Sequence, residues 1–325
     1  MCVFCNQNKI NGADFESSIY NIEKTIDEQL ATIKPESTVE ISFFGGSFTG
    51  IAVEIQEKLL KKANEYIKAG KVTGIRVSTR PDYISDSIVE MLLKYGVTTV
   101  ELGVQSFDEM VLESSKRGHS YDDIVNAAKI IKKAGINLGI QLMPGLPGSD
   151  FEKDYNSAVE TAAIKPEYVR IYPTVVVANT ELEELYKKGE YNPLSIDEAV
   201  EICSKMIAVI ELAGIKIIRV GLQPSEELRA EGNIVAGPFH SAFRELAEGE
   251  IYYSFLKKLY EKCGKLELVL NEKDVSKTVG IKKRNIERIG YKNMVFKLDN
   301  SIEKGKIAVN GEIFSKEDIL KNMIG

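Results

Sequence analysis

Between residue 40 and about residue 220, the chain alternates short apolar runs rich in β-branched residues with longer segments in which apolar residues recur every three to four positions. The short runs predict strands, and the longer segments predict helices. The predicted strands are residues 40–44, 74–78, 99–103, 137–142, 168–172 and 216–220. The predicted helices are residues 52–69, 85–95, 121–134, 151–164 and 196–213. This rhythm indicates successive β-α units and a parallel sheet.

Glycines end three of these helices. Gly96, Gly135 and Gly214 each follow an apolar helix and precede the next strand, where a helix C-cap is expected. Periodicity does not distinguish an open doubly wound sheet from a barrel. The polar and glycine-rich clusters favour a barrel, because nearly all of them lie at the C-terminal end of a strand. We therefore predict an α/β fold, a partial or full (β/α) barrel over residues 1–250.

After about residue 250 the pattern changes to a lysine-rich helix, 251–263, followed by short alternating runs at 265–270, 294–298 and 306–309. This pattern predicts a small C-terminal α+β domain over residues 251–325, suited to binding substrate or RNA. The domain contains a basic cluster made of Lys282, Lys283, Arg284, Arg288 and Lys292. Such a cluster is either a solvated face or a contact for nucleic acid.

Composition narrows the class of protein. The chain has 325 residues, 44% of them hydrophobic, and no apolar run of the length that a membrane span requires, so we expect a soluble protein without a membrane partner. A net charge of -6 argues against a surface that binds nucleic acid over its whole extent. The absence of a visible signal peptide favours a cytoplasmic location. The four cysteines are too few and too unevenly spaced for a secreted disulfide scaffold.

Two of the cysteines, Cys2 and Cys5, form a CxxC pair. Two thiolates at this spacing can hold one metal ion or one edge of an iron–sulfur cluster, and Phe4 between them would shield it from solvent. A redox pair and half of a zinc site are alternative interpretations of the same spacing.

Polar or glycine-rich residues follow all six predicted strands. Adjacent glycines let a ligand approach the main chain, whereas hydroxyl, amide and guanidinium groups suit the sugar, carboxylate and amine of an amino acid joined to a nucleoside. Each motif also has a structural alternative, such as a tight turn, the start of a helix or a surface salt bridge. The same applies to His119, which we interpret as a residue at a helix start or a supporting residue rather than a general base. In chain order the candidates are Gly45, Gly46, Ser47, Ser78, Arg80, Glu101, Gln105, Arg117, Arg170, Tyr172 and Arg219.

The ordered set of motifs is more specific than any single member. It comprises the cysteine pair, FFGGSFT, STRPD, VELGVQS with a downstream RGH, QLMPGLPG, and VRIYPTVVVANTELEELYKKGEYNP. Over roughly residues 1–245 this set resembles the radical S-adenosylmethionine (SAM) domain of the Elongator subunit 3 family. It is also similar to stand-alone radical SAM proteins labelled oxygen-independent coproporphyrinogen oxidase-like. No acetyltransferase-like domain is visible after it, so the stand-alone relatives are the better match.

The resemblance implies a [4Fe–4S] cluster on a CxxxCxxC motif and SAM as the second cofactor, which the reduced cluster cleaves to a 5′-deoxyadenosyl radical. Cys2 and Cys5 match the second and third cluster ligands. The first ligand would lie four residues before Cys2, ahead of Met1. We therefore expect a truncated N-terminus, with a degenerate, non-catalytic homologue as the alternative.

The resemblance also implies roles for single residues. Gly45, Gly46 and Ser47 would meet the SAM amino group. Ser78 and Arg80 would lie near its ribose or methionine part. Gln105 and Arg117 match SAM-binding positions, Glu101 does so less specifically, and Arg170 and Tyr172 would face the radical. The expected substrate-side residues are Arg219, Gln223, Gly237, Pro238, Phe239, His240 and Arg244.

Three functions are compatible with the sequence. The first is a radical SAM enzyme that modifies a tRNA base, by analogy with the wobble-uridine chemistry of the Elongator family. The second is a radical SAM enzyme acting on a small molecule, and the third is a vestigial RNA-binding protein. A ferredoxin or flavodoxin is the expected reductant for the two enzymes. The sequence does not indicate the substrate or the oligomeric state.

Overall fold

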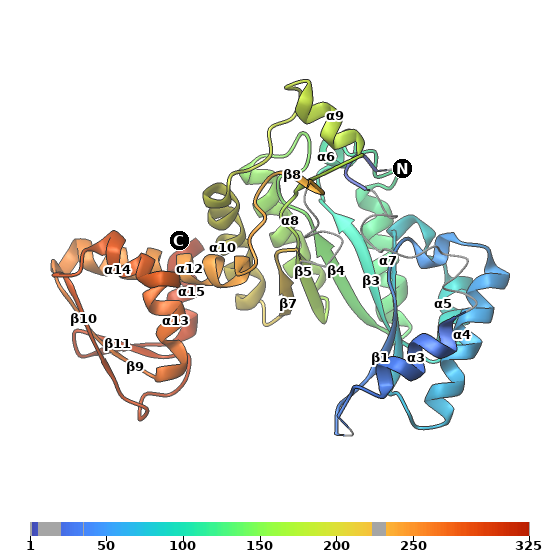
Figure 1. Ribbon diagram of the computed structural model, residues 1–325, viewed down its shortest axis with the longest axis horizontal. Helices are drawn as coiled ribbons and strands as arrows, with labels where there is room; N and C mark the ends of the chain where they lie inside the picture. The colour runs from blue at the N-terminus through green and yellow to red at the C-terminus, as the bar shows by residue number, and fades with distance from the viewer. Residues whose placement is uncertain (1, 6–20, 35, 223–231, 325) are drawn as a thin grey trace.

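The structure is a computed structural model that describes residues 2–5, 21–34, 36–222 and 232–324. At its centre lies a parallel sheet of six strands in the order β1-β2-β3-β4-β5-β7 (Figure 1). These strands are β1 (Glu40–Phe43), β2 (Gly74–Thr79), β3 (Val97–Gln105), β4 (Asn137–Leu142), β5 (Tyr168–Ile171) and β7 (Lys216–Val220). β1 and β7 are its two edges and do not pair, so the fold is a partial barrel. The prediction of an α/β barrel, full or partial, is confirmed in its partial form.

A helix follows each of the first five strands of this sheet. All five predicted helices are present, and each end lies within one residue of the prediction. They are α4 (Val53–Lys68), α5 (Asp86–Lys94), α7 (Tyr121–Lys133), α8 (Phe151–Ile164) and α10 (Ile196–Leu212). Among the described residues before α10, the sequence pattern missed three shorter helices, α3 (Ile22–Leu30), α6 (Glu109–Ser114) and α9 (Glu181–Lys187). The strand that differs most from its prediction is β3, which is two residues longer at each end.

The two faces of the six-stranded sheet differ in polarity. Leu102, Ile140 and Ile171 point to one face and belong to the main hydrophobic core. Their neighbours Glu101, Gln141 and Arg170 point to the other face, because successive strand residues alternate in direction. We call this second side the inner face. A closed barrel fills its interior with bulky branched side chains. The inner face here is polar instead, so it is suited to contact a ligand.

The C-terminal part is built on the long helix α12 (Phe243–Cys263), which begins eight residues before the predicted helix 251–263. The predicted domain boundary at 250/251 therefore lies inside a helix, and the division into two domains stays a prediction. A four-stranded sheet of order β10-β9-β11-β12 follows. Its strands are β9 (Leu266–Leu270), β10 (Met294–Leu298), β11 (Ile307–Val309) and β12 (Glu312–Phe314), with helices α13 (Val275–Val279), α14 (Arg284–Ile289) and α15 (Lys316–Ile324).

Helix α15 joins this C-terminal part to the barrel. It packs on α10, and Lys316 forms a 2.9 Å ion pair with Glu211 there. Figure 1 shows the small sheet at one end of the molecule, beyond α12.

Two cations of the basic cluster are paired, since Arg284 contacts Asp197 at 2.7 Å and Arg288 contacts Glu250. Among the described residues, none of the helices has the length and apolar character needed to cross a bilayer.

Gly221, at the end of β7, provides a first test of the packing. Its φ is +83°, and a Cβ atom there would lie 2.8 Å from the Cβ of buried Phe243, the first residue of α12. We expect Gly221→Ala to lower the free energy of unfolding by about 2–3 kcal/mol, from left-handed backbone strain and overpacking together. Gly214→Ala is the control, because Gly214 has a φ of +75° and no atom within 4 Å of the added methyl group. Its loss should be about 1 kcal/mol in the same urea titration. Equal losses would contradict the packing argument.

Candidate functional site

The cysteine pair forms a turn that the fold holds in place. The Cys5 amide donates a 3.1 Å hydrogen bond to the Cys2 carbonyl. Between them, Val3 is 1% exposed and packs with Val176 and Leu182. Its amide donates to the Ser115 carbonyl after α6, and its carbonyl accepts from the Leu182 amide in α9. The turn therefore lies beside α6 and α9 (Figure 1).

Arg117 connects this turn to the sheet. Its Nη1 lies 3.0 Å from the Cys2 Sγ, its Nη2 donates to the Gly103 carbonyl in β3, and its guanidinium lies 5.8 Å from the centre of the Phe4 ring. Burial lowers the pKa of Arg117, and the neighbouring Cys2 opposes that effect. Electropositive surroundings of this kind are typical of cysteines that act as metal ligands or nucleophiles.

Beside the turn, the buried Gln105 Oε1 and Arg117 Nε atoms have no hydrogen-bond partner among the residues that the structure describes. The two side chains pass over Gly103, where an added Cβ would meet Gln105 Nε2 at 3.0 Å and Arg117 Nη2 at 3.3 Å. Gln105 has a φ of +71° at an irregularity in the β3–β4 pairing. Leaving such atoms unpaired costs about 1–3 kcal/mol each. Their position indicates a site for a polar ligand, and the chemistry of a cysteine pair, an amide and a guanidinium fits an iron–sulfur cluster with an amino-acid ligand.

The ends of β1 and β2 border the same region. Gly45 and Gly46 follow β1 with φ values of 117° and 150°, and both are exposed. Ser47 precedes a short 3-10 helix, η1 (Phe48–Gly50), and none of its side-chain atoms caps that helix. At the end of β2, Ser78 is half-buried, and its hydroxyl lies 3.4 Å from Gln141 Nε2.

Arg80 ties the end of β2 to the loop that carries Arg117. It contacts the Asp82 carboxylate at 2.6 and 2.9 Å and donates to the Gly118 carbonyl at 2.9 Å. Partial burial works against its charge, but Asp82 outweighs burial and raises the pKa of Arg80. Arg80 therefore holds this loop in position, and its guanidinium is largely committed to protein partners.

A chain of charged side chains crosses the inner face. Glu101 is 1% exposed and accepts from Arg76 at 2.8 Å, from Arg170 at 2.7 and 3.1 Å, and from Gln141 at 3.0 Å. Arg76 also contacts Glu40 at 2.6 and 3.1 Å. We call Glu40, Arg76, Glu101 and Arg170 the charge belt. Burial alone would raise the pKa of Glu101, but Arg170, Arg76 and Gln141 together lower it.

Arg170 and Tyr172, both predicted from the sequence, lie together at the end of β5. Arg170 Nη1 lies 3.3 Å from the Tyr172 hydroxyl, and the half-exposed Phe44 ring lies 5.5 Å from the Arg170 guanidinium. Burial raises the pKa of Tyr172 although Arg170 opposes it. The Tyr172 hydroxyl therefore stays protonated at neutral pH.

Reasoning on strand ends missed Glu40, Arg76 and Gln141, which lie within strands. Their signal was a polar residue at every second strand position, as in Glu40-Ile41-Ser42 and Arg76-Val77-Ser78. Of the expected substrate-side residues, Gln223 lies outside the described residues. Arg244 forms a 2.8 Å ion pair with Glu248 within α12, and His240 Nδ1 accepts from the Ala242 amide.

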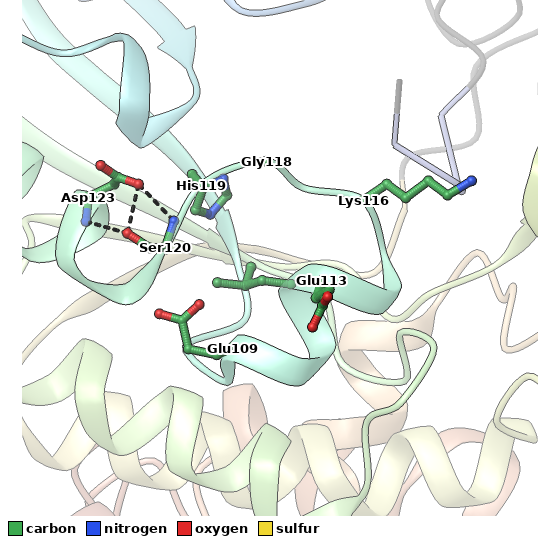
Figure 2. A pocket seen from close by; sticks show the side chains of 8 residues that line it. Glu109, Glu113, Lys116, Gly118, His119, Ser120 and Asp123 are labelled. Atoms are coloured by element: carbon green, nitrogen blue, oxygen red, sulfur yellow. Dashed lines mark hydrogen bonds between the residues drawn. The ribbon is translucent and has the colours of Figure 1, made fainter.

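A separate pocket of about 550 Å³ lies by the loop between α6 and α7 (Figure 2). It is lined by Glu109, Leu112, Glu113, Lys116, Gly118, His119, Ser120 and Asp123. His119 is 6% exposed, its Nε2 lies 3.2 Å from the Val104 carbonyl, and burial lowers its pKa to about 4. Ser120 and Asp123 form the capping box of α7. These contacts agree with a residue at a helix start. No cluster of three or more metal-binding side chains occurs among the residues that the structure describes.

Comparison with known proteins identifies the family. Residues 1–158 match the model of the radical SAM superfamily, and residues 166–253 match the model of the radical SAM C-terminal domain. The chain is 31% identical over 275 residues to a protein of Methanocaldococcus jannaschii named tRNA uridine(34) acetyltransferase, covering 78% of this chain and 49% of that protein. It is 29% identical over 192 residues to Elongator complex protein 3 of Saccharomyces cerevisiae, covering 53% of this chain and 34% of that protein.

Solved structures agree with these matches. Elongator protein 3 of Methanocaldococcus infernus, lacking its residues 1–46, has a TM-score of 0.60 and 29% identity, covering 77% of this chain and 59% of that one. Coproporphyrinogen III oxidase of Escherichia coli shares the fold, with a TM-score of 0.50 and 16% identity. That match covers 66% of this chain and 50% of the oxidase chain. The chain spans about half the length of the curated relatives that it matches. On its two family matches and its partial barrel, the chain belongs to the radical SAM superfamily of enzymes, in the group that resembles Elongator protein 3.

Proposed function

We propose that this enzyme binds a [4Fe–4S] cluster and SAM at the C-terminal ends of β1 to β3 and uses them to modify a tRNA base. The observation that carries the proposal is the cysteine turn beside Arg117 and Gln105, whose buried Nε and Oε1 atoms lack partners within the described part of the chain. When bound, the cluster supplies the electron for reductive cleavage of SAM.

Cys2 and Cys5 would hold the cluster, with Phe4 and Val3 excluding water from it. A CxxxCxxC motif provides three thiolates, and the other two cysteines do not belong to this site. Cys203 is fully buried in α10, where burial raises its pKa, and Cys263 is exposed at the end of α12. No other cysteine occurs among the 325 residues, so none of them provides the third thiolate.

Residues at the remaining strand ends would contact different parts of SAM. The main chain at Gly45 and Gly46, with Ser47, would meet its amino group, while Gln105 and Arg117 would supply the unpaired amide oxygen and guanidinium nitrogen. Ser78 would reach the ribose or methionine part. Arg80 would position the loop of Arg117, because its Nε donates to Asp82 and its Nη2 to Asp82 and Gly118.

On the substrate side, Arg170 and Tyr172 would face the reacting carbon. We propose that Glu101 acts as a positioning residue rather than a SAM ligand, since both of its oxygens already accept from Arg76, Arg170 and Gln141. Glu101 would fix the Arg170 guanidinium and, through it, the Tyr172 hydroxyl.

The tRNA part of the proposal rests on the names of the relatives, one of which is a tRNA uridine(34) acetyltransferase. The alternative is a small-molecule substrate. It is favoured by the net charge of -6 and by the pairing of Arg284 and Arg288, which leaves less of the basic cluster for RNA. A ferredoxin or flavodoxin as reductant and a cytoplasmic location stay predictions.

The proposal is tested by anaerobic iron–sulfur reconstitution of this chain and of a version that carries Cys-Xaa-Xaa ahead of Met1, which completes CxxxCxxC. We expect the extended protein to bind about four iron atoms per chain and to form 5′-deoxyadenosine from SAM under reducing conditions. Cys2→Ser in the extended protein should abolish both, and Cys263→Ser should change neither. If the extended protein binds no more iron than its Cys2→Ser variant, the proposed cluster site is wrong.

A further inference from the structure

The charge belt alternates in sign across the inner face until the edge strand β7. Glu40, Arg76, Glu101 and Arg170 lie on β1, β2, β3 and β5. Arg76 contacts the carboxylates of both neighbouring strands, and Arg170 reaches Glu101 across β4. On β7 the register pairs Arg219 with Arg170. Arg219 therefore lies beside another arginine and breaks the alternation.

Arg219 has no ion-pair partner among the residues that the structure describes. Glu101, the carboxylate that Arg170 contacts, already accepts from both Arg76 and Arg170. Like charges directly opposite each other on neighbouring strands are destabilising. A half-buried guanidinium in this position can form strong, charge-assisted hydrogen bonds with an anion that joins it.

Arg170 connects Arg219 to a hydroxyl donor. It is the register partner of Arg219, and its Nη1 lies 3.3 Å from the Tyr172 hydroxyl. The charge of Arg219 also acts to lower the pKa of Tyr172, against the effect of burial. The Phe44 ring, which follows β1, lies 5.5 Å from the Arg170 guanidinium, and Phe44 is 48% exposed. The surroundings of Arg170 and Arg219 thus combine two arginines, a phenol and an exposed aromatic residue.

We propose that Arg219 and the Tyr172 hydroxyl form an oxyanion-binding subsite that takes a phosphate or carboxylate group of the substrate. The exposed Phe44 ring favours a nucleotide as the source of the group, because a base can stack on an aromatic ring beside an arginine. Naming the ligand as substrate rests on the proposed function. The binding of an anion by Arg219 does not.

The subsite is tested on the full chain without SAM by calorimetric titration and thermal unfolding. The probes are uridine 5′-monophosphate, uridine, inorganic phosphate and succinate. We expect the nucleotide to bind and to raise the midpoint of unfolding, with uridine binding more weakly. Arg219→Gln should weaken nucleotide binding roughly tenfold or more, and Arg219→Lys should weaken it less. Arg284→Gln, which removes a paired arginine outside the barrel, should bind as the unchanged protein does.

Stability without ligand separates this role from a structural one. Arg219→Gln should unfold at the same temperature as the unchanged protein or higher, because it removes a contact between like charges. Stronger binding of succinate than of the nucleotide would assign the subsite to a carboxylate. The subsite is wrong if no anionic probe binds the unchanged protein, if Arg219→Gln binds equally well, or if that variant loses several degrees of stability. Since no probe involves SAM, failure of SAM cleavage would leave these results standing.

Discussion

Replacing Glu101 with glutamine should lower the free energy of unfolding by about 3–5 kcal/mol, because it leaves two buried arginines without their shared carboxylate. The Glu101 side chain is 1% exposed, and those of Arg76 and Arg170 are 12% and 19% exposed. The glutamine amide keeps the shape but supplies only one acceptor oxygen and no charge. Strands β2, β3 and β5 would then lose the contacts that join their inner faces.

The measurement is the midpoint and slope of urea unfolding at pH 7. Glu303→Gln is the matched control, since Glu303 forms a 2.7 Å ion pair with Lys306 but its side chain is 72% exposed. That control should leave the stability almost unchanged, because a solvent-exposed ion pair contributes little. If Glu101→Gln lowers the free energy of unfolding by less than about 1 kcal/mol, water or a shift of neighbouring side chains replaces the carboxylate. The charge belt would then not hold the inner-face side chains in place.

The second large effect is on how the free energy of unfolding depends on pH. Two buried groups, Asp154 and His119, change it in opposite directions. Asp154, at the start of α8, is 4% exposed and accepts from Ser149 Oγ at 2.6 Å and from the Gly145 amide at 2.8 Å. Burial raises its pKa to about 7, against the two hydrogen bonds. The folded protein therefore binds a proton here that the unfolded chain has already lost. Stability from Asp154 is present at low pH and falls as the pH rises through 7, by roughly 2 kcal/mol between pH 5 and pH 7.

His119 works in the other direction. Burial lowers its pKa to about 4, and the nearby Arg117 adds to that effect. The unfolded chain binds a proton below about pH 6.5, whereas the folded protein does not. Stability from His119 is therefore present above pH 6.5 and falls as the pH drops toward 4, again by roughly 2 kcal/mol between pH 7 and pH 5. The two contributions nearly cancel in the unchanged protein.

Replacing one of the two groups should reveal how the other changes the free energy of unfolding with pH. With Asp154→Asn, the free energy of unfolding should fall by roughly 2 kcal/mol more between pH 7 and pH 5 than it does in the unchanged protein. The glutamine amide in His119→Gln can still donate to the Val104 carbonyl. In this variant the free energy of unfolding should rise by a similar amount as the pH drops from 7 to 5. Chemical unfolding at pH 5, 6 and 7 measures both. If either variant keeps the slope of the unchanged protein, that group does not titrate as its burial implies.

The local pattern of the sequence determined the secondary structure of the barrel. Strands β4 and β7 and helix α8 match their predicted bounds, because their apolar periodicity and end signals are contained within the element itself. The same pattern located the polar strand ends, since parallel strands place all of their C-terminal ends along one edge. The short helices α3, α6 and α9 carry too few periodic positions to be predicted in this way.

Only the tertiary structure decided which charges meet. Glu101 contacts Arg76, 25 residues earlier, and Arg170, 69 residues later, because the register of three strands brings them together. Among the described residues, Arg219 lacks an ion-pair partner and Gln105 and Arg117 carry unpaired atoms, and these features also depend on strand register. The open edge between β1 and β7 is likewise invisible in any single segment. A residue's type and its strand are local properties, but its partner depends on how distant strands align, and that alignment is decided by packing of the whole chain.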